Sequence, residues 1–185
     1  MICCKEKLKY VLHYVRETFK DYSVQYNIFG FFGLMSLIFK NVEESYSHLL
    51  YSYKHHVCFK KVEDYLRGRV IHKYHDVDKI AMYALFPWLG VECINHIHTL
   101  WQDHHPCYKD LDDNKAYKPK DEVEWTEAVV DWECARFTKP DKPLNAYDTY
   151  LKYYYKSEYT GVIINTLISL GLLSVKTTDT GIVYE

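Results

Sequence analysis

Apolar side chains recur every three or four residues along most of this chain, the spacing that places them on one face of an α-helix. The first such segment covers residues 5–20, a second covers 28–39 and a third covers 42–66. Gly68 follows the third segment and is expected to end it. The pattern therefore predicts three helices before residue 69. The apolar positions of the first are Leu8, Val11, Leu12, Val15 and Phe19.

The rest of the chain also has mostly helical spacing, and signals for β-strands are sparse. The predicted fold class is therefore all-α. The expected segments are a helix that begins within 69–79 and bears His75 and Asp76, a helical stretch at 80–101 interrupted near Pro87, an irregular loop at 104–119, helices at 121–137, 145–159 and 162–173, and a strand or frayed tail at 174–185.

The chain of 185 residues is long enough for one domain with a sizeable core. We expect an N-terminal helical extension at residues 1–41, a helical domain at 42–173 and a tail at 174–185. The apolar run at 28–39 is too short to cross a bilayer, which needs about 20 residues. A buried or partner-facing helix is expected here instead of a membrane span, and a homodimer through the N-terminal helices is one candidate assembly. Docking of this helix on a lipid surface stays open as the alternative.

Composition and charge exclude several classes of protein. Hydrophobic residues make up 48% of the chain and charged residues 26%, which is ordinary for a globular protein. The formal net charge is −2 and no block of lysine and arginine is present, so no nucleic-acid polymer is expected as a partner. The six cysteines are scattered, and the N-terminus lacks the pattern of a secretory signal. A cytoplasmic protein with reduced thiols is expected.

Histidine and aspartate are the candidates for chemistry. Eight of the ten histidines fall between residues 55 and 105, and His75 is followed directly by Asp76. Asp131 stands in the apolar run Ala128–Trp132, where a charged carboxylate must be paired or bind a metal ion. Imidazole and carboxylate together suit divalent transition metals. The pattern indicates a helical metallohydrolase.

The two histidines of the pair at 55 and 56 lie on different faces of the predicted helix. His55 belongs to a row that becomes apolar toward the end of the helix, so it is the better candidate for an inward-facing ligand. His56 shares a row with Lys60, Glu63 and Arg67, and we expect this row to be solvated.

Adjacent residues on a helix point about 100° apart. His75 and Asp76 therefore converge on one ion only if the ion lies over the edge between their rows. A histidine from an earlier helix and an aspartate from a later helix then complete the site. The predicted ligands are His55, His75, Asp76 and Asp131.

The order His, His-Asp, Asp along a helical chain resembles the HD-domain superfamily of metal-dependent phosphohydrolases. The closer likeness is to an uncharacterised branch found in bacteria and phages. The resemblance covers roughly residues 45–160, and the first 40 residues have no counterpart in it. The stretches that carry it are Lys54-His55, His75-Asp76-Val77-Asp78-Lys79, His98 with His104-His105-Pro106-Cys107-Tyr108, and Val130-Asp131-Trp132.

This resemblance implies one or two divalent ions, drawn from manganese, iron, cobalt, nickel, zinc and magnesium. The implied ligands are His55, His75, Asp76 and Asp131 for the first ion, and Asp76 with residues such as His98, His104 and His105 for the second.

The gap between His98 and the His104-His105 pair is longer here than in the family pattern. The choice of ligands among these histidines and His96 therefore stays open. His96 and His98 differ by two positions, so only one of them faces inward on a helix, and we favour His98.

Four further residues are candidates for contacts with substrate or protons. Lys79 matches a lysine that faces substrate phosphate in the family, where its charge would stabilise the transition state. Asp78 is a candidate catalytic acid or base, or a partner of Lys79, although a helix-surface carboxylate is the alternative. His72 and Arg136 are candidate substrate contacts; the alternatives are a solvated histidine and a surface ion pair of Arg136 with Glu133.

The function predicted from these residues is hydrolysis of a nucleotide or another small phosphate ester by metal-activated water. The location would be the host cytoplasm if a phage encodes the protein. Two alternatives stay open. One is a di-iron oxygenase of the same fold, and the other is a helical binding protein with a structural or decayed metal site.

Overall fold

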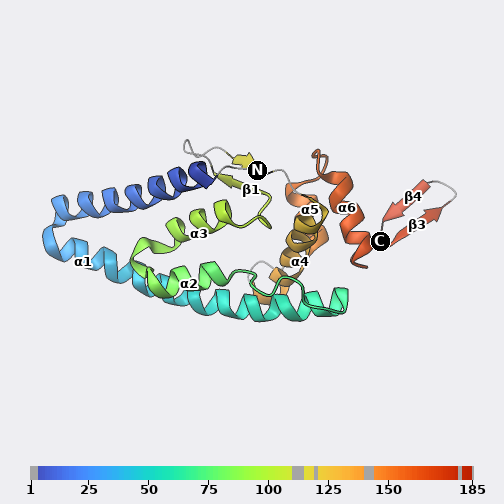
Figure 1. Cartoon of the computed structure of the whole chain (residues 1–185), viewed down its shortest axis with the longest axis horizontal. Coiled ribbons are helices and arrows are strands. Elements are labelled where there is room, and N and C mark those ends of the chain that lie inside the picture. Colours follow the sequence, from blue (N-terminus) through green and yellow to red (C-terminus); the bar gives the residue numbers. More distant parts are fainter. Residues whose placement is uncertain (1–3, 110–114, 119–120, 140–143, 179–180, 185) are drawn as a thin grey trace. The chain divides into compact units, whose positions relative to one another are not determined.

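The computed structural model of the chain describes residues 4–109, 115–118, 121–139, 144–178 and 181–184, without the side chains of 4, 25–29, 108–109, 115–117, 175–178 and 181–184. Helices dominate this part of the chain, so the predicted all-α class is confirmed (Figure 1). Two short antiparallel hairpins accompany the helices. Their strands are β1 (Cys107–Lys109) with β2 (Lys115–Tyr117), and β3 (Val175–Thr178) with β4 (Gly181–Tyr184).

The first helix, α1, spans Cys4–Arg67 and includes all three predicted N-terminal helices. Gly30 kinks it with φ 64° and ψ −159°, a conformation that glycine reaches because it has no Cβ. The expected break near residue 41 is absent: the helix continues through Asn41, whose side chain donates to the carbonyl of Trp88, at 3.2 Å. As predicted, the helix ends at Gly68, which has φ 66°.

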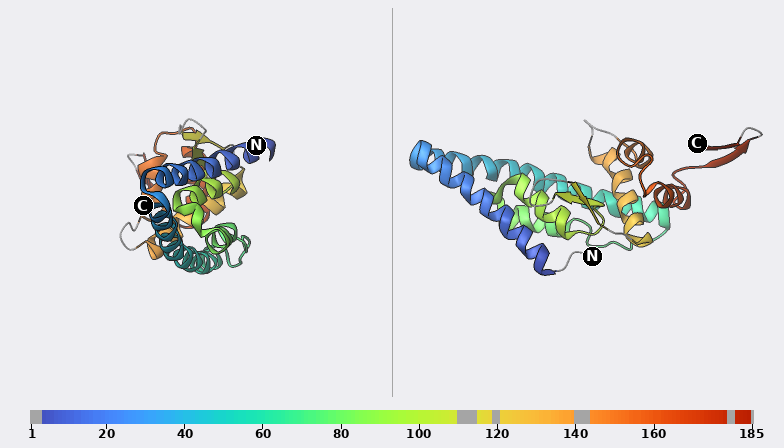
Figure 2. Two further views of the ribbon diagram at one scale, coloured as in Figure 1. Left: turned by 90° about the vertical axis from the view of Figure 1, so that its left-hand side faces the viewer. Right: turned by 90° about the horizontal axis from the view of Figure 1, so that it is seen from above.

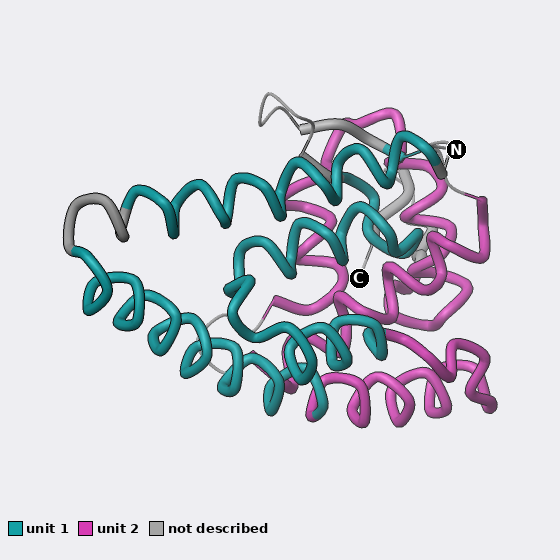
Figure 3. Tube along the Cα trace, turned by 60° about the vertical axis from the view of Figure 1, so that its left-hand side comes forward, with its two compact units in different colours: residues 1–53, 76–119 teal, residues 54–75, 120–185 magenta. Residues whose placement is uncertain are grey.

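The chain divides into two compact units (Figure 3). Unit 1 contains residues 1–53 and 76–119, and unit 2 contains residues 54–75 and 120–185. Each unit is therefore built from two separate stretches of sequence.

In unit 1, the two arms of α1 diverge from the kink and hold α2 (Val77–Leu85), η1 (Pro87–Leu89) and α3 (Gly90–Trp101) between them (Figures 1 and 2). Lys7 Nζ on the first arm donates to the carbonyl of Trp101, at 3.1 Å. Ser45 Oγ on the second arm donates to the carbonyl of Pro87, at 2.9 Å. The predicted interruption near Pro87 is the short 3-10 helix η1.

Residues 69–76 are not helical, and 73–76 form a turn. The helix expected to begin within 69–79 begins at Val77, so the prediction that it bears both His75 and Asp76 was wrong. Asp76 has φ 59° and ψ 8°, a left-handed conformation that an α-helix does not contain, and it is the N-cap of α2. Aspartate is one of the few residues with a side chain that tolerate this region. The directions of His75 and Asp76 are therefore set by a turn.

Unit 2 consists of α4 (Glu122–Thr138), α5 (Ala146–Tyr153), α6 (Thr160–Ser169) and the end of α1. Asp121 and Glu124 form a capping box at the start of α4. The last two helices are shorter than predicted, because turns follow Tyr153 and Ser169. The core is aliphatic and aromatic, and its largest members are Phe59, Trp125, Trp132, Tyr150, Tyr154, Ile163 and Leu167.

The two hairpins lie where the sequence shows little periodicity. The irregular loop predicted at 104–119 contains β1 and β2, whose register pairs residues 107–109 with 117–115; residues 110–114 and 119 lie outside the described part. For the tail at 174–185, the strand alternative is the one observed.

No single helix in the described part of the chain is long and apolar enough to cross a membrane. The segments Val77–Leu85 and Pro87–Trp101 reach that length and apolarity only together, and they are bent by 91°.

Candidate metal centre

In unit 1, His98 brings an imidazole to the start of α2. It lies on the buried face of α3 and is 0% exposed. Its Nε2 atom is 3.0 Å from Oδ1 of Asp76, the N-cap residue of α2. The left-handed backbone of Asp76 places this carboxylate at the helix start, where it is 5% exposed.

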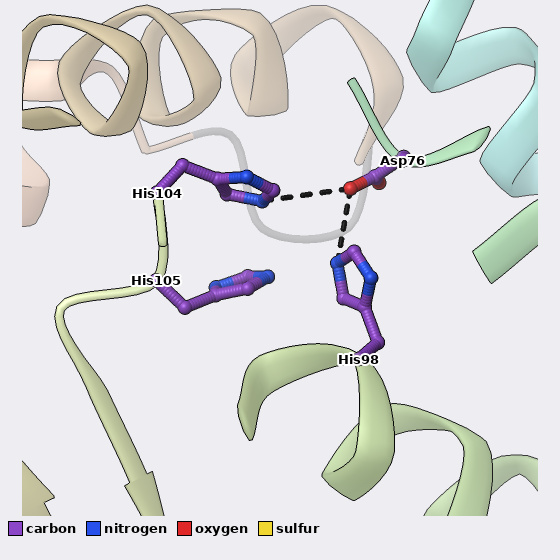
Figure 4. Close-up of side chains that lie close together, drawn as sticks. All are labelled: Asp76, His98, His104 and His105. Carbon is purple, nitrogen blue, oxygen red and sulfur yellow. Dashed lines mark ion pairs between the residues drawn. The ribbon is translucent and has the colours of Figure 1, made fainter. Parts of the chain in front are cut away.

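Two further histidines follow in the turn between α3 and β1. His104 is 2% exposed, and its Nε2 atom lies 3.5 Å from Oδ1 of Asp76. The ring of His105 lies 4.3 Å from that of His104 and 4.8 Å from that of His98, measured between centroids. Figure 4 shows the three imidazoles gathered on one side of the carboxylate.

The four residues Asp76, His98, His104 and His105 form the first candidate site, which we call the unit 1 cluster. Each offers one ligand atom, and these atoms all lie within 4.8 Å of one another. Ligand atoms bind a transition metal at about 2.0–2.2 Å, so two ligands of one ion are roughly 3–4 Å apart. The cluster could therefore hold a metal ion after small side-chain movements.

Lys118 fixes the segment that carries His104 and His105. It is 5% exposed, and its Nζ atom donates to the carbonyls of Thr99 and Gln102 at the C-terminal end of α3, both at 2.5 Å. A cation at this end of a helix is favourable because the last carbonyls have no partner in the helix. The backbone N–H of Lys118 also donates to the carbonyl of Pro106, at 3.0 Å.

Asp78 holds the second nitrogen of His98. Nδ1 of His98 lies 3.0 Å from Oδ2 of Asp78, one turn into α2. Metal-binding histidines commonly donate their other N–H to a carboxylate, which fixes the ring and its tautomer. His98 thus has the environment of such a ligand, with Nδ1 held and Nε2 directed at Asp76.

These contacts shift the protonation of both partners. Burial alone lowers the pKa of His98, but its hydrogen bonds to Asp76 and Asp78 and the charge of Asp76 outweigh burial and raise the pKa above 6.5. Burial raises the pKa of Asp78, and the hydrogen bond and charge of His98 reverse that effect, so the pKa of Asp78 is lowered. The cluster favours positive charge at its centre.

Unit 2 contains a second group of imidazoles and carboxylates, formed by α1, the turn before α2, and α4. Oδ1 of Asp131 lies 2.7 Å from Nε2 of His55 and 3.4 Å from Nε2 of His75. Nδ1 of His75 donates to Oε1 of Glu127, at 3.0 Å, and its ring stacks on Phe59 with centroids 3.7 Å apart. His55, His75, Asp131 and Glu127 are the unit 2 cluster.

Asp131 is the charged centre of the unit 2 cluster. Burial raises its pKa, but the hydrogen bonds and charges of His55 and His75 hold the pKa well below 3.8. The sequence expectation that Asp131 needs a partner is therefore confirmed, and its partners in the structure are imidazoles.

The expectation that His56 and Glu63 are solvated was wrong. His56 is 8% exposed and its Nδ1 atom donates to the carbonyl of His75, at 2.6 Å. Glu63 is 0% exposed and accepts from the backbone N–H groups of Ile71 and His72. The turn at 69–75 folds back over this face of α1 and covers it. The predicted surface position of His56 was based only on its polar helix row, which does not show that a later segment covers it.

His72 and Arg136, the candidate substrate contacts, both have acidic partners. Nδ1 of His72 lies 2.6 Å from Oε1 of Glu63, so the alternative of a solvated histidine was wrong. Arg136 pairs with Glu133 at 2.8 Å, the partner named in the alternative, but Glu133 is buried and the pair is therefore not a surface pair.

Lys79 and His96 have different relations to the unit 1 cluster. Lys79 lies in the first turn of α2, and its positive charge opposes the rise in the pKa of His98. The pKa of His48 is lowered mainly by burial, and the charge of Lys79 lowers it further. His96 lies outside the cluster, and its ring packs 4.5 Å from that of Tyr14. The preference for His98 over His96 as the inward-facing residue is confirmed by burial.

Sequence reasoning did not identify Glu127 and Glu63. Glu127 precedes Asp131 by four residues, which places the two carboxylates on one face of α4. That spacing was a usable signal. Glu63 had no such signal, because its role depends on the turn that covers it.

Comparisons of the chain with protein families, with curated proteins and with solved structures find no match. The geometry of the two clusters is therefore the basis for a functional proposal.

Proposed function

We propose that this chain is a metal-dependent hydrolase of small phosphate esters. The observation that supports this most is the unit 1 cluster, with ligand atoms within 4.8 Å of one another. Three imidazoles and one carboxylate suit zinc, iron, cobalt, nickel and manganese better than magnesium, which prefers oxygen ligands. The carboxylates of Asp76 and Asp78 would together balance the double charge of the ion.

A divalent ion held in the cluster would supply Lewis acidity and would lower the pKa of bound water toward neutrality. Asp76, His98, His104 and His105 are the residues that would hold it. Asp78 keeps Nδ1 of His98 protonated, so that Nε2 is the nitrogen left for the ion. Lys79, one residue further along α2, supplies positive charge that would attract a substrate phosphate.

The unit 2 cluster is proposed as the ligand set of a further ion. His55, His75 and Asp131 would provide two imidazoles and one carboxylate, and Glu127 would orient His75 through Nδ1. This set also suits transition metals, because imidazole is among its donors.

A second candidate function is a helical interaction protein whose metal ion is structural. The observation that favours it is the close pairing in the unit 2 cluster, where Asp131 and Glu127 already engage both imidazoles. Such a network stabilises the fold without an ion, since hydrogen-bonded polar groups tolerate burial.

Metal analysis combined with a substrate panel distinguishes these functions. We expect the purified chain to contain transition metal by mass spectrometry and to hydrolyse members of a panel of p-nitrophenyl phosphate, nucleoside monophosphates and cyclic nucleotides. Asp76→Asn should lose both properties. Asp103→Asn is the matched control, because Asp103 is 59% exposed and pairs with Lys7 on the surface.

Three results would change the proposal. Full hydrolysis by metal-free Asp76→Asn would refute it. Bound metal without turnover of any ester, together with unfolding on chelation, would favour the structural alternative. Bound iron with an absorbance change that depends on oxygen would favour a di-iron oxygenase.

A further inference from the structure

The second arm of α1 carries apolar side chains along one narrow face. At 100° per residue, positions 32, 35, 39, 42, 46, 50 and 53 fall within an arc of about 80°. Every one of these positions is aliphatic or aromatic. We call this face the apolar stripe, and its members are Phe32, Met35, Phe39, Val42, Tyr46, Leu50 and Tyr53.

Six of the seven stripe residues are exposed, and Met35 is partly buried. Phe32 is 86% exposed, Phe39 65% and Tyr46 61%. Ser45 and Ser52, which lie about 100–120° around the helix from the centre of the stripe, are 0% exposed. This arm of α1 therefore has one face within unit 1 and a second apolar face directed to solvent.

The order of side chains along the stripe has the pattern of a helix pair. Its aromatic residues, at 32, 39, 46 and 53, recur every seven residues, and smaller aliphatic residues lie between them. A narrow seam with a seven-residue period is typical of helices that pack against a second helix in a coiled coil.

We propose that the apolar stripe is the interface of a homodimer, in which two copies of this arm pack antiparallel. In a pair centred on residue 44, Val42 faces Tyr46 of the partner subunit, and Met35 faces Tyr53 of the partner subunit. In each of these contacts a large ring meets a smaller side chain, as close packing requires. A parallel pair would instead stack the bulky rings on one another.

The exposed area is sufficient for this interface. A large aromatic side chain has about 150–250 Å² of surface, so the four rings expose roughly 500 Å² per copy before the aliphatic residues are added. Two copies would bury about 1,000 Å² from the rings alone, which reaches the lower limit of a specific interface before the aliphatic residues are counted. The stripe maps onto itself by a two-fold rotation, as a C2 dimer requires.

A lipid surface fits the stripe less well than a second copy does. Helices that lie on membranes combine a broad apolar face with a polar face rich in lysine and arginine. Here the apolar face is narrow, Glu43 borders it, and the chain has a net charge of −2.

The mass of the full chain in solution tests the proposal. Sedimentation analysis should show twice the 22.1 kDa of one chain. Val42→Glu/Tyr46→Glu should weaken self-association by at least about 100-fold, because it places unpaired charges in the seam. Leu12→Glu is the matched control: Leu12 is as exposed as Tyr46, at 61%, but lies on the other arm of α1.

Mixtures of single variants test the orientation. Val42→Glu mixed with Tyr46→Lys should associate at least tenfold more tightly than either variant alone, because the opposite charges meet only in the antiparallel pair. Val42→Glu mixed with Val42→Lys should show no such gain. The reverse result would overturn the antiparallel arrangement.

Other outcomes would overturn the interface itself. One is a chain that stays at 22.1 kDa up to about 100 μM, and another is equal loss of the dimer in Leu12→Glu. A third is binding of a monomeric chain to phosphatidylserine vesicles that Val42→Glu/Tyr46→Glu abolishes, since that result would assign the stripe to lipid. Circular dichroism should show unchanged helix content in every variant.

Discussion

His98 is the residue on which the chemistry of unit 1 depends most. Its ring lies between two carboxylates at 3.0 Å on either side, and it is fully buried. A buried imidazole in this position has two possible states. It is either a cation whose charge both carboxylates neutralise, or a neutral metal ligand whose remaining N–H donates to one carboxylate. The same contacts therefore set up a competition between a proton and a metal ion.

Asp78 is expected to control metal affinity without touching the ion. Asp78→Ala should weaken metal binding by about 10–100-fold, because Nδ1 of His98 loses its partner and the ring its orientation. Asp78→Asn should restore part of the affinity, since its carbonyl oxygen still accepts from Nδ1. Titration with Co²⁺, followed through its visible absorption bands, measures the affinity and the ligand geometry together. Equal affinity in Asp78→Ala and the unaltered chain would show that Asp78 has no such role.

Metal binding should weaken as pH falls. The ligand must be neutral, whereas Asp76 and Asp78 raise the pKa of His98 above 6.5 and favour its protonated form. Without metal, the stability of the fold has the opposite dependence on pH. The stabilisation that comes from the raised pKa of His98 is fully present below about pH 6.5, the pKa of histidine in the unfolded chain, and it is lost as pH rises through the pKa of His98 in the folded chain. Thermal unfolding between about pH 5 and 9, with and without Zn²⁺, measures both trends. Parallel trends in the two series would contradict this competition.

At the scale of single elements, α4 provides both carboxylates of the unit 2 cluster. Glu127 and Asp131 are one helical turn apart, and both contact His75. The capping box of Asp121 and Glu124 fixes the start of this helix, upstream of both carboxylates. The stability of the cluster therefore depends on a cap that contributes no ligand.

Removal of the cap should destabilise α4. Asp121→Ala is expected to lower the free energy of unfolding by about 1 kcal/mol, since the N–H of Glu124 loses its acceptor. Chemical denaturation followed by circular dichroism measures this change. Glu122→Ala, in the same first turn, is the control and should cost less because Glu122 is not the cap residue. A larger loss in the control would argue against the capping box.

The helix boundaries also show which structural features the sequence pattern predicts and which it does not. The start of α4 and the break at Pro87 were predicted, because capping residues and proline act locally. The helix expected to begin within residues 69–79 begins only at Val77, after His75 and Asp76, because Asp76 has a left-handed backbone that a helix cannot contain. The segment at 69–75 also buries His56 and Glu63, which their helix row had placed on the surface.

At the scale of the whole molecule, bound metal should contribute to stability by mass action. An ion that binds the folded chain alone stabilises it by about 2.7 kcal/mol when its concentration is about 100 times the dissociation constant. Neither cluster is preassembled in an unfolded chain, because each joins residues from separate stretches of sequence.

Chelation should therefore lower the melting temperature. Dialysis of the full chain against EDTA is expected to lower it by several degrees, and added Zn²⁺ or Mn²⁺ should restore it. Asp76→Asn should respond less than the unaltered chain, whereas His96→Gln should respond equally, because His96 lies outside the unit 1 cluster. Differential scanning calorimetry provides the measurement. Identical curves before and after chelation would leave no role for a bound ion in stability.

The sequence by itself determined the all-α class, most helix positions and the identity of nearly all candidate ligands, because helical periodicity, caps and residue chemistry are local properties. The tertiary structure decided how those ligands are grouped. It placed Asp76 with His98, His104 and His105, and it placed Asp131 with His55, His75 and Glu127. The physical reason is that a turn with one left-handed residue, together with packing between distant segments, sets the direction of each side chain, and neither leaves a periodic trace along the chain.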